Sequence, residues 1–341
     1  MATFAGVSAY MLAVVRRIPQ PGSVEPVPRL AITVGMVLFL VCVGVVAYYA
    51  QHITHSIRVS SAMDRVVDDA LRIGNAGGTH DVVDHDAVPE PPDHSRVVPA
   101  SDTGYMQGVD MDALVQLAVE RGLVIRLRPM VGDPVVQGGP LAWVWTADAD
   151  GAGAAARDID DGLRERIGSA AQIGGNRTLD RDFTYGLRQL VDVAIRAMSP
   201  SLNDPYTAVE AIDHLTTMLC RLAERPLGAR VRRDDDGRIV VAQPGPDLLT
   251  CVELACDQIR RYGGHEPAVA VRLLILLREV AVHAHHDMRS QLHAQVQRVV
   301  DHAETAAQAD GDVRVVRAAA DTASAWIDGN VVPDEVAFAR L

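Results

Sequence analysis

Residues 194–208 of the chain read Ala-Ile-Arg-Ala-Met-Ser-Pro-Ser-Leu-Asn-Asp-Pro-Tyr-Thr-Ala. Pro200 predicts the end of a helix, because proline disfavours the helical conformation of the residue before it. Asn203 or Asp204 can cap a second helix, and Pro205 suits its first position, where an N–H group would lack a partner anyway. The stretch therefore predicts a tight polar turn between two helices.

Both segments beside this turn repeat apolar residues at three- and four-residue intervals, which is the pattern of a helix with one buried face. The apolar positions are Phe183, Leu187, Leu190, Val191, Ala194, Ile195 and Met198 before the turn, and Val209, Ile212, Leu215, Leu219 and Leu222 after it. Two such helices joined by a short turn predict an αα-hairpin.

Polar side chains in the turn and in its approach are the candidate ligand-binding residues: Arg177, Asp182, Arg196, Ser199, Asn203, Asp204 and Thr207. Helix amino termini favour anions through free N–H groups and the helix dipole, so these residues could converge on a pocket for a carboxylate or a phosphate. The alternative is a capping network that only fixes the angle of the hairpin.

No catalytic residue is predicted. Ser199, Asp204 and His214 are the residue types of a hydrolytic triad, but a G-x-S-x-G elbow is missing and His214 lies more than two helical turns beyond the cap. His283, His286, Asp287 and His293 are more typical of a polar helix face than of a metal site, and His80, His85 and His94 are more typical of solvated side chains.

Composition excludes several functions. The net charge is −12, which argues against nucleic-acid binding, and all 32 basic residues are arginine. Without lysine the chain has no Schiff-base, P-loop or lipoyl lysine, so we expect no cofactor. The four cysteines lack C-x-x-C spacing, which indicates a reducing compartment.

The amino-terminal part is strongly apolar. Residues 30–50 carry no charge over a length that suits a bilayer, which predicts a transmembrane helix, while the apolar run 4–15 is too short and predicts a partial span. We expect a membrane region over 1–52, a juxtamembrane helix over 53–73 and a linker over 74–100, which is rich in proline and glycine.

The remainder predicts two further regions. Short strands separated by glycine turns over 101–147 resemble the barrel-sandwich modules of biotinyl and lipoyl domains, so a small β-barrel-like subdomain is expected there. A mostly α-helical bundle follows over 148–330, with a β-hairpin at 229–242 that turns at Asp-Gly, and then a tail over 331–341. The fold class is therefore an α+β membrane protein.

The turn, with the Arg177-Thr178 pair, Asp182 and the Val131-Gly-Asp-Pro-Val-Val-Gln-Gly-Gly-Pro-Leu block, resembles a bacterial family of predicted membrane proteins, domain of unknown function 2254. Its motif reads R-A-L-S-P-x-I-N-D-P-x-T-A, from which Met198 and Leu202 depart. The resemblance covers the chain to about residue 330. It implies a multi-span membrane protein, with the long domain in the cytoplasm, and this chain lacks the first two or so membrane helices of the family. The resemblance supplies no catalytic residues.

The expected function is that of a non-enzymatic integral membrane protein. A domain that senses a small molecule or a protein would be coupled to the membrane helices, with a possible channel or transport role. We expect the lipid bilayer and further copies of the chain as partners, and no nucleic acid. Two alternatives remain: a membrane-tethered, hydrolase-like enzyme that uses the polar turn 196–207, and a membrane scaffold.

Overall fold

The computed structural model describes residues 12–13, 29–56, 59–75, 81–146, 160–307 and 309–330. The chain divides into two compact units, residues 1–62 and 63–341, and each is described by itself. Most of the expected partial span 4–15 and the whole of the expected tail 331–341 lie outside the described residues.

Among the described residues of the first unit, the long helix is α2 (Arg29–Ser56), of 28 residues. Large apolar side chains are exposed along it, at Leu30, Val34, Met36, Val37, Phe39, Leu40, Val41, Val43 and Val45. Within the described residues, however, no helix combines the length and the apolar character that crossing a bilayer requires. The structure therefore contradicts the transmembrane helix expected at 30–50.

Helix α3 (Val59–Asn75) lies where a juxtamembrane helix was expected, but it takes part in the core of the second unit. Its residues Met63, Val67 and Ala70 are buried among the helices of that unit. Gly186 permits the close approach, because a Cβ at this position would lie 2.9 Å from the Cβ of Ala70. From Met63 onward, α3 is thus a packed helix of the folded domain.

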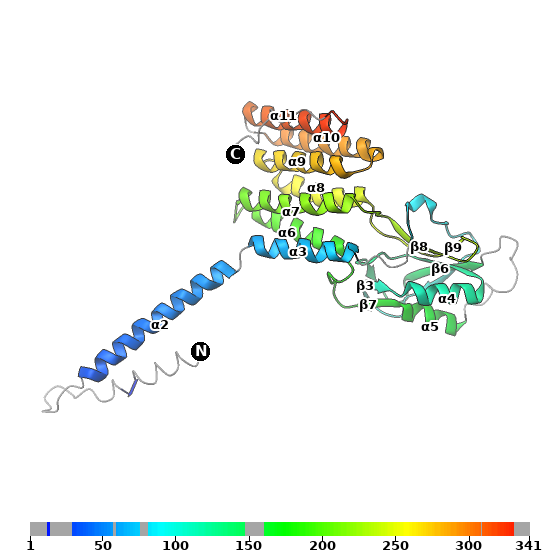
Figure 1. The fold of residues 1–341 in the computed structure, drawn as a ribbon, viewed down its shortest axis with the longest axis horizontal. Helices are drawn as coiled ribbons and strands as arrows, with labels where there is room; N and C mark the ends of the chain where they lie inside the picture. Colours follow the sequence, from blue (N-terminus) through cyan, green and yellow to red (C-terminus); the bar gives the residue numbers. More distant parts are fainter. Residues whose placement is uncertain are drawn as a thin grey trace. The chain divides into compact units, whose positions relative to one another are not determined.

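Together with α3, the long helices α6 to α11 build the larger core of the second unit (Figure 1). Helices α6 and α7 form the helical hairpin on either side of the polar turn, and α9 lies against α7, α10 and α11. The helices are α6 (Phe183–Ala197), α7 (Pro205–Ala223), α8 (Leu248–Gly263), α9 (Pro267–His283), α10 (Arg289–Ala306) and α11 (Asp310–Ile327), with the short 3-10 helix η2 (His286–Met288) before α10.

The strands of the second unit form two separate sheets. The larger has the order β1-β8-β9-β4-β6-β2, in which only the β4–β9 pair is parallel. Its strands are β1 (Asp81–Val83), β2 (Arg96–Pro99), β4 (Leu123–Leu127), β6 (Pro140–Thr146), β8 (Ala229–Arg233) and β9 (Ile239–Gln243). The smaller has the order β5-β3-β7, formed by β5 (Pro134–Val135), β3 (Gly104–Val109) and β7 (Ala171–Gly174).

Helices α4 (Met111–Arg121) and α5 (Asp161–Ala170) share a second apolar core with these sheets. The two open sheets contradict the small barrel-like subdomain expected over 101–147. Its glycine turns are local features, whereas the sheet is completed by strands from distant parts of the chain, such as β9 beside β4. In the part of the chain that the structure describes, the fold class is α+β, with two open sheets in place of the expected barrel-sandwich.

Two segments differ from their expected roles. The described part of 74–100, expected as a linker, contributes β1, β2 and the 3-10 helix η1 (His85–Ala87). The β-hairpin expected at 229–242 is present as β8 and β9, but it pairs with β1 and β4 and so belongs to the larger sheet, not to the helical bundle. The strand β9 leads directly into α8, which ties the sheet to the bundle (Figure 1).

Candidate functional site

The polar turn between α6 and α7 is closed by its own backbone. The N–H of Asn203 donates to the carbonyl of Ser199 at 2.9 Å, and the N–H of Asp204 donates to the carbonyl of Ala197 at 2.9 Å. Asn203 has φ of 45°, in the left-handed region that asparagine tolerates better than most residues. The backbone donors at the centre of the turn are therefore used to hold the turn itself.

Asp204 is the cap of α7. Its carboxylate accepts the N–H of Thr207 at 3.1 Å and the hydroxyl of Thr207 at 2.6 Å. The hydroxyl of Thr207, followed by the backbone N–H groups, lowers the pKa of Asp204. The hydroxyls of Ser199 and Ser201 lie 3.2 Å apart, while the side chains of Arg196 and Asn203 are exposed. This end of the hairpin is a capping network at the surface.

Arg177 and Asp182 form a second polar group, at the start of α6. The guanidinium of Arg177 donates to Asp182 Oδ2 through Nε at 2.9 Å and through Nη2 at 2.7 Å. Asp182 Oδ1 accepts the hydroxyl of Thr184 at 2.6 Å and the N–H of Tyr185 at 3.1 Å, so the same carboxylate caps α6. Asp182 is only 4 % exposed, and its charge is matched inside the protein.

Gly132 joins this ion pair to the smaller sheet. Its φ is +96°, and a Cβ there would overlap Asp182 Oδ2 and lie 2.8 Å from Arg177 Nη2. The N–H of Gly132 donates to the carbonyl of Met106 in β3 at 2.7 Å. No sequence pattern indicates this contact, although both partners belong to the stretches that carry the family resemblance. The pair therefore fixes the joint between the strands and the helical bundle.

The seven candidate residues thus lie in two groups at opposite ends of α6. The helix has 15 residues, which is roughly 22 Å by helical rise. Arg177 and Asp182 lie at its start, and the structure does not bring them together with the five candidates of the turn. A ligand-binding role for either group stays a prediction.

The residue types of a hydrolytic triad are also separated. His214 Nδ1 lies 3.6 Å from Asp64 Oδ1 of α3, while Asp204 is occupied by Thr207. Ser199 contacts Ser201 in the turn. The structure therefore directs these three side chains to three different partners.

Two histidines near the α9–α10 connection, His283 and His293, pair with carboxylates. His283 Nδ1 lies 3.0 Å from Glu224 Oε1, and His293 Nε2 lies 2.9 Å from Asp328 Oδ1. In the part of the chain that the structure describes, histidine, cysteine and acidic side chains form no group of three or more that could hold a metal ion.

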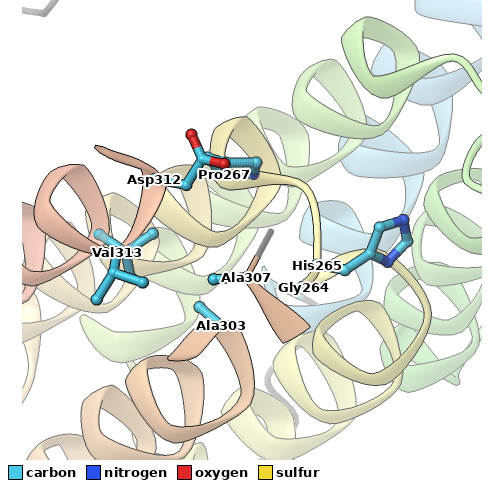
Figure 2. A pocket seen from close by; sticks show the side chains of 8 residues that line it. Gly264, His265, Pro267, Ala303, Ala307, Asp312 and Val313 are labelled. Atoms are coloured by element: carbon cyan, nitrogen blue, oxygen red, sulfur yellow. The ribbon is translucent and has the colours of Figure 1, made fainter. Parts of the chain in front are cut away.

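A small hollow opens where the α8–α9 connection meets α10 and α11 (Figure 2). Val313 and His265 lie on opposite sides of it, with Ala303 and Ala307 between them. Gly264, Pro267, Asp312 and Val316 complete the lining. It has room for about one water molecule, so it is too small for a metabolite.

Comparison with known proteins identifies relatives without an assigned activity. Residues 1–279 match the family described as "Predicted membrane protein (DUF2254)". The uncharacterized proteins Rv1290c of Mycobacterium tuberculosis and Mb1321c of Mycobacterium bovis are 34% identical to this chain over 321 residues. That alignment covers 92% of this chain and 61% of each relative, so the chain spans less than two thirds of their length.

No solved structure matches the chain. The family match covers most of the chain and includes the Val131 to Leu141 block, the Arg177–Asp182 pair and the polar turn. It confirms the resemblance that those residues carry. The chain belongs to the DUF2254 family of predicted membrane proteins.

Proposed function

We propose that this chain is a non-enzymatic, membrane-attached protein in which residues 1–62 associate with lipid and the second unit senses a ligand or partner. The observation that carries the proposal is the exposed apolar surface of α2, where Phe39 and Leu40 are 55% and 64% exposed. Proteins rarely leave large apolar surfaces in water unless these contact a partner or a membrane. The family to which the chain belongs supports lipid as the partner.

Helix α3 supports a mechanical connection between the two roles. Its backbone continues from the first unit into the second, where Met63 and Val67 are buried. Its carboxyl-terminal part is held by Arg225, whose Nη1 donates to the carbonyl of Leu71 at 3.0 Å. A change at the membrane that shifts α3 would therefore alter its packing against the helical hairpin, and a ligand that reshapes the hairpin would act in reverse.

A cytoplasmic location of the second unit is part of this proposal. Cys220, Cys251 and Cys256 are free thiols, which suits a reducing compartment. Protease added to intact cells should leave this unit uncut, and protease added after lysis should cut it. Cleavage in intact cells at the same rate as in lysate would place the unit on the other side.

Fractionation of the full chain tests membrane attachment. The wild-type protein should stay with the membrane fraction after a high-salt wash and leave it with detergent, because salt screens charges but does not weaken apolar contacts. Substituting both Phe39→Glu and Leu40→Glu should release a large share of the protein into the supernatant.

The matched control combines Val282→Glu and Val315→Glu, which introduce the same two charges at exposed apolar positions of α9 and α11. It should remain in the membrane fraction. Attachment through α2 is refuted if the wild-type chain stays in the supernatant without detergent, or if the control is released as readily as the double variant of α2.

A further inference from the structure

Arg230 on β8 lacks the counter-charge that its neighbours have. Arg232 Nη2 lies 2.6 Å from Asp112 Oδ1, and Arg233 Nε lies 3.3 Å from Asp81 Oδ2. Arg230 is partly buried on β8, which lies between β1 and β9, and it makes no ion pair with any described residue. An arginine stays protonated in proteins, so a half-buried guanidinium without a partner leaves a positive charge to be matched.

A second arginine lies close by. The guanidinium of Arg181 rests on Gly108 of β3, where a Cβ would lie 2.7 Å from its Nη1. Arg181 also makes no ion pair among the described residues. Burial, and then the positive charge of Arg181, lower the pKa of Arg230. Two like charges held near each other in a chain of net charge −12 cost stability unless an anion lies between them.

A buried amide completes the group. Gln243 is the residue directly opposite Arg230 in the antiparallel β8–β9 pair, so the two side chains lie on the same face of the sheet. Gln243 is 2% exposed, yet its Nε2 has no acceptor among the described residues. Buried donors are almost always paired, and one without a partner calls for an explanation such as an absent ligand.

This face of the sheet also meets the beginning of α4. The contact between Arg232 and Asp112 places β8 against the first turn of that helix, and Gly108 lies two residues before its cap, Asp110. Arg181, which is exposed, leaves the group open to solvent on one side.

We propose that Arg181, Arg230 and Gln243 form a binding site for a phosphate-bearing anion. Two guanidinium groups match the charge of a phosphate, which is near −2 at neutral pH, and offer the paired donors that its oxygens accept. The amide of Gln243 supplies a further donor at the buried end of the site. The biological role of this site rests on the proposed sensing function, because the phosphate-bearing anion would be the ligand that the second unit senses.

Phosphate oxygens could come from a soluble molecule or from a lipid headgroup. The recognition chemistry is the same for both, so the sources are separated by the form in which the phosphate is supplied. Inorganic phosphate serves as the soluble probe. Phosphatidylcholine vesicles with and without phosphatidic acid serve as the lipid probe.

The experiment measures thermal unfolding of the full chain in detergent with inorganic phosphate or with chloride at equal ionic strength. Phosphate should raise the Tm of the wild-type protein in a saturable way, because a ligand that binds only the folded state stabilises it. Arg230→Gln should bind phosphate about tenfold more weakly or worse, which corresponds to the loss of a charge-assisted contact. In chloride its Tm should equal or exceed that of wild type, because the repulsion is relieved.

Arg314→Gln is the control, since Arg314 is an exposed arginine of α11 without an ion pair among the described residues. It removes the same charge and should keep the phosphate response. If Arg230→Gln does not fold, Arg181→Gln at the exposed side of the site should still weaken the response. The inference is overturned if wild type shows no phosphate-specific rise in Tm, or if Arg230→Gln and Arg181→Gln respond as the control does.

Vesicle flotation identifies the source. Wild-type chain that gains affinity for vesicles with phosphatidic acid, where Arg230→Gln does not, would assign a lipid headgroup, whereas a response to inorganic phosphate alone would assign a soluble ligand. Fractionation of the double variant with Phe39→Glu and Leu40→Glu tests membrane attachment independently of phosphate binding. A failure of the phosphate site therefore leaves the result on attachment intact, and a failure of attachment leaves the phosphate result intact.

Discussion

Gly132 and Asp182 lie so close that position 132 has no room for a side chain beside the carboxylate. Through this contact, the turn before β5 of the smaller sheet packs against the Arg177–Asp182 ion pair at the start of α6. In that pair, Arg177 Nη2 lies 2.7 Å from Asp182 Oδ2. The relative position of sheet and bundle therefore depends on a glycine and on a buried carboxylate that are distant in the sequence.

Replacing Gly132 by alanine should destabilise the fold. The residue has φ of +96°, which costs a non-glycine residue about 1–3 kcal/mol, and the new methyl group would also displace the ion pair. Chemical denaturation gives the free energy of unfolding. Gly138→Ala is the control, because its φ of +79° imposes a similar backbone cost with no atom within 4 Å. Equal losses in the two variants would show that the contact with Asp182 is unimportant.

Asp182→Ala should cost roughly 3 kcal/mol, since it removes a helix cap and leaves the guanidinium of Arg177 without its buried partner. The matched comparison is Asp192→Ala, which breaks the exposed pair with Arg188 at 2.9 Å and should cost less than about 1 kcal/mol. Unfolding free energies of the two variants that agree within error would contradict the assignment of Asp182 as the structural centre of the joint.

The contact between Gly186 and Ala70 predicts a compensating pair of substitutions. Gly186→Ala should destabilise by about 1–3 kcal/mol, because its methyl group would push α3 away from α6. Adding Ala70→Gly removes the opposing methyl group and should recover part of that loss. A double-mutant cycle measures the coupling, and strictly additive effects would mean that α3 and α6 do not pack as described.

The cap at Asp204 predicts a defined pH dependence. Hydrogen bonds from Thr207 lower its pKa in the folded state below the ordinary value of 3.8, so the folded chain binds this proton less readily than the unfolded chain. The contribution is complete above about pH 4 and is lost as the pH falls through the folded-state pKa. Asp204→Ala should cost about 1 kcal/mol at pH 7 and progressively less in acid.

Denaturation of wild type and Asp204→Ala from pH 7 to acid measures this difference. Asp204→Asn serves as control, because asparagine caps about as well and does not titrate. A difference between wild type and Asp204→Ala that stays constant down to the most acidic pH would disprove the role of the carboxylate.

The buried cysteines predict slow thiol chemistry in the native protein. Burial raises the pKa of Cys251 and of Cys256 to about 12, and that of Cys220 to about 11. Because the thiolate is the reactive form, a disulfide reagent at pH 8 should modify Cys251 and Cys256 only as fast as the protein unfolds. Mass spectrometry locates the modified residues, and rapid native labelling of either one would mean that the helical core is open.

The membrane region and the barrel show where sequence patterns were insufficient. Residues 30–50 lack charge, and the glycine turns of 101–147 resemble those of a small barrel, but each inference used one local property of the chain. Among the described residues, no helix is long and apolar enough to cross a membrane. In the second unit, β1 pairs with β8 and β4 pairs with β9, and both partner strands lie more than eighty residues further along the chain. Pairing between distant strands leaves no local signal.

For the candidate site, too, the sequence indicated local features and the structure decided which residues lie together. The capping role of Asp204 depends on a group three residues away, so the residue types alone indicated where α7 begins. Asp182 caps α6 in the same way, but the sequence indicated it only as a candidate ligand-binding residue. Whether the two groups share a pocket depends on the length and direction of α6, and the structure places them at its two ends. Arg181, Arg230 and Gln243 carried no sequence signal, because their association depends on strand register.

The sequence by itself determined the helical hairpin around residues 198–204, a cap at Asn203 or Asp204, and membership of the DUF2254 family. These properties follow from interactions between residues a few positions apart and from a contiguous motif. Only the tertiary structure decided that β9 pairs with β4, that Gly132 meets Asp182 and that Arg230 lies near Arg181 with no ion pair among the described residues. Such contacts form when packing of the apolar cores brings distant segments together, and the polar groups then find whichever partners the packed chain places beside them.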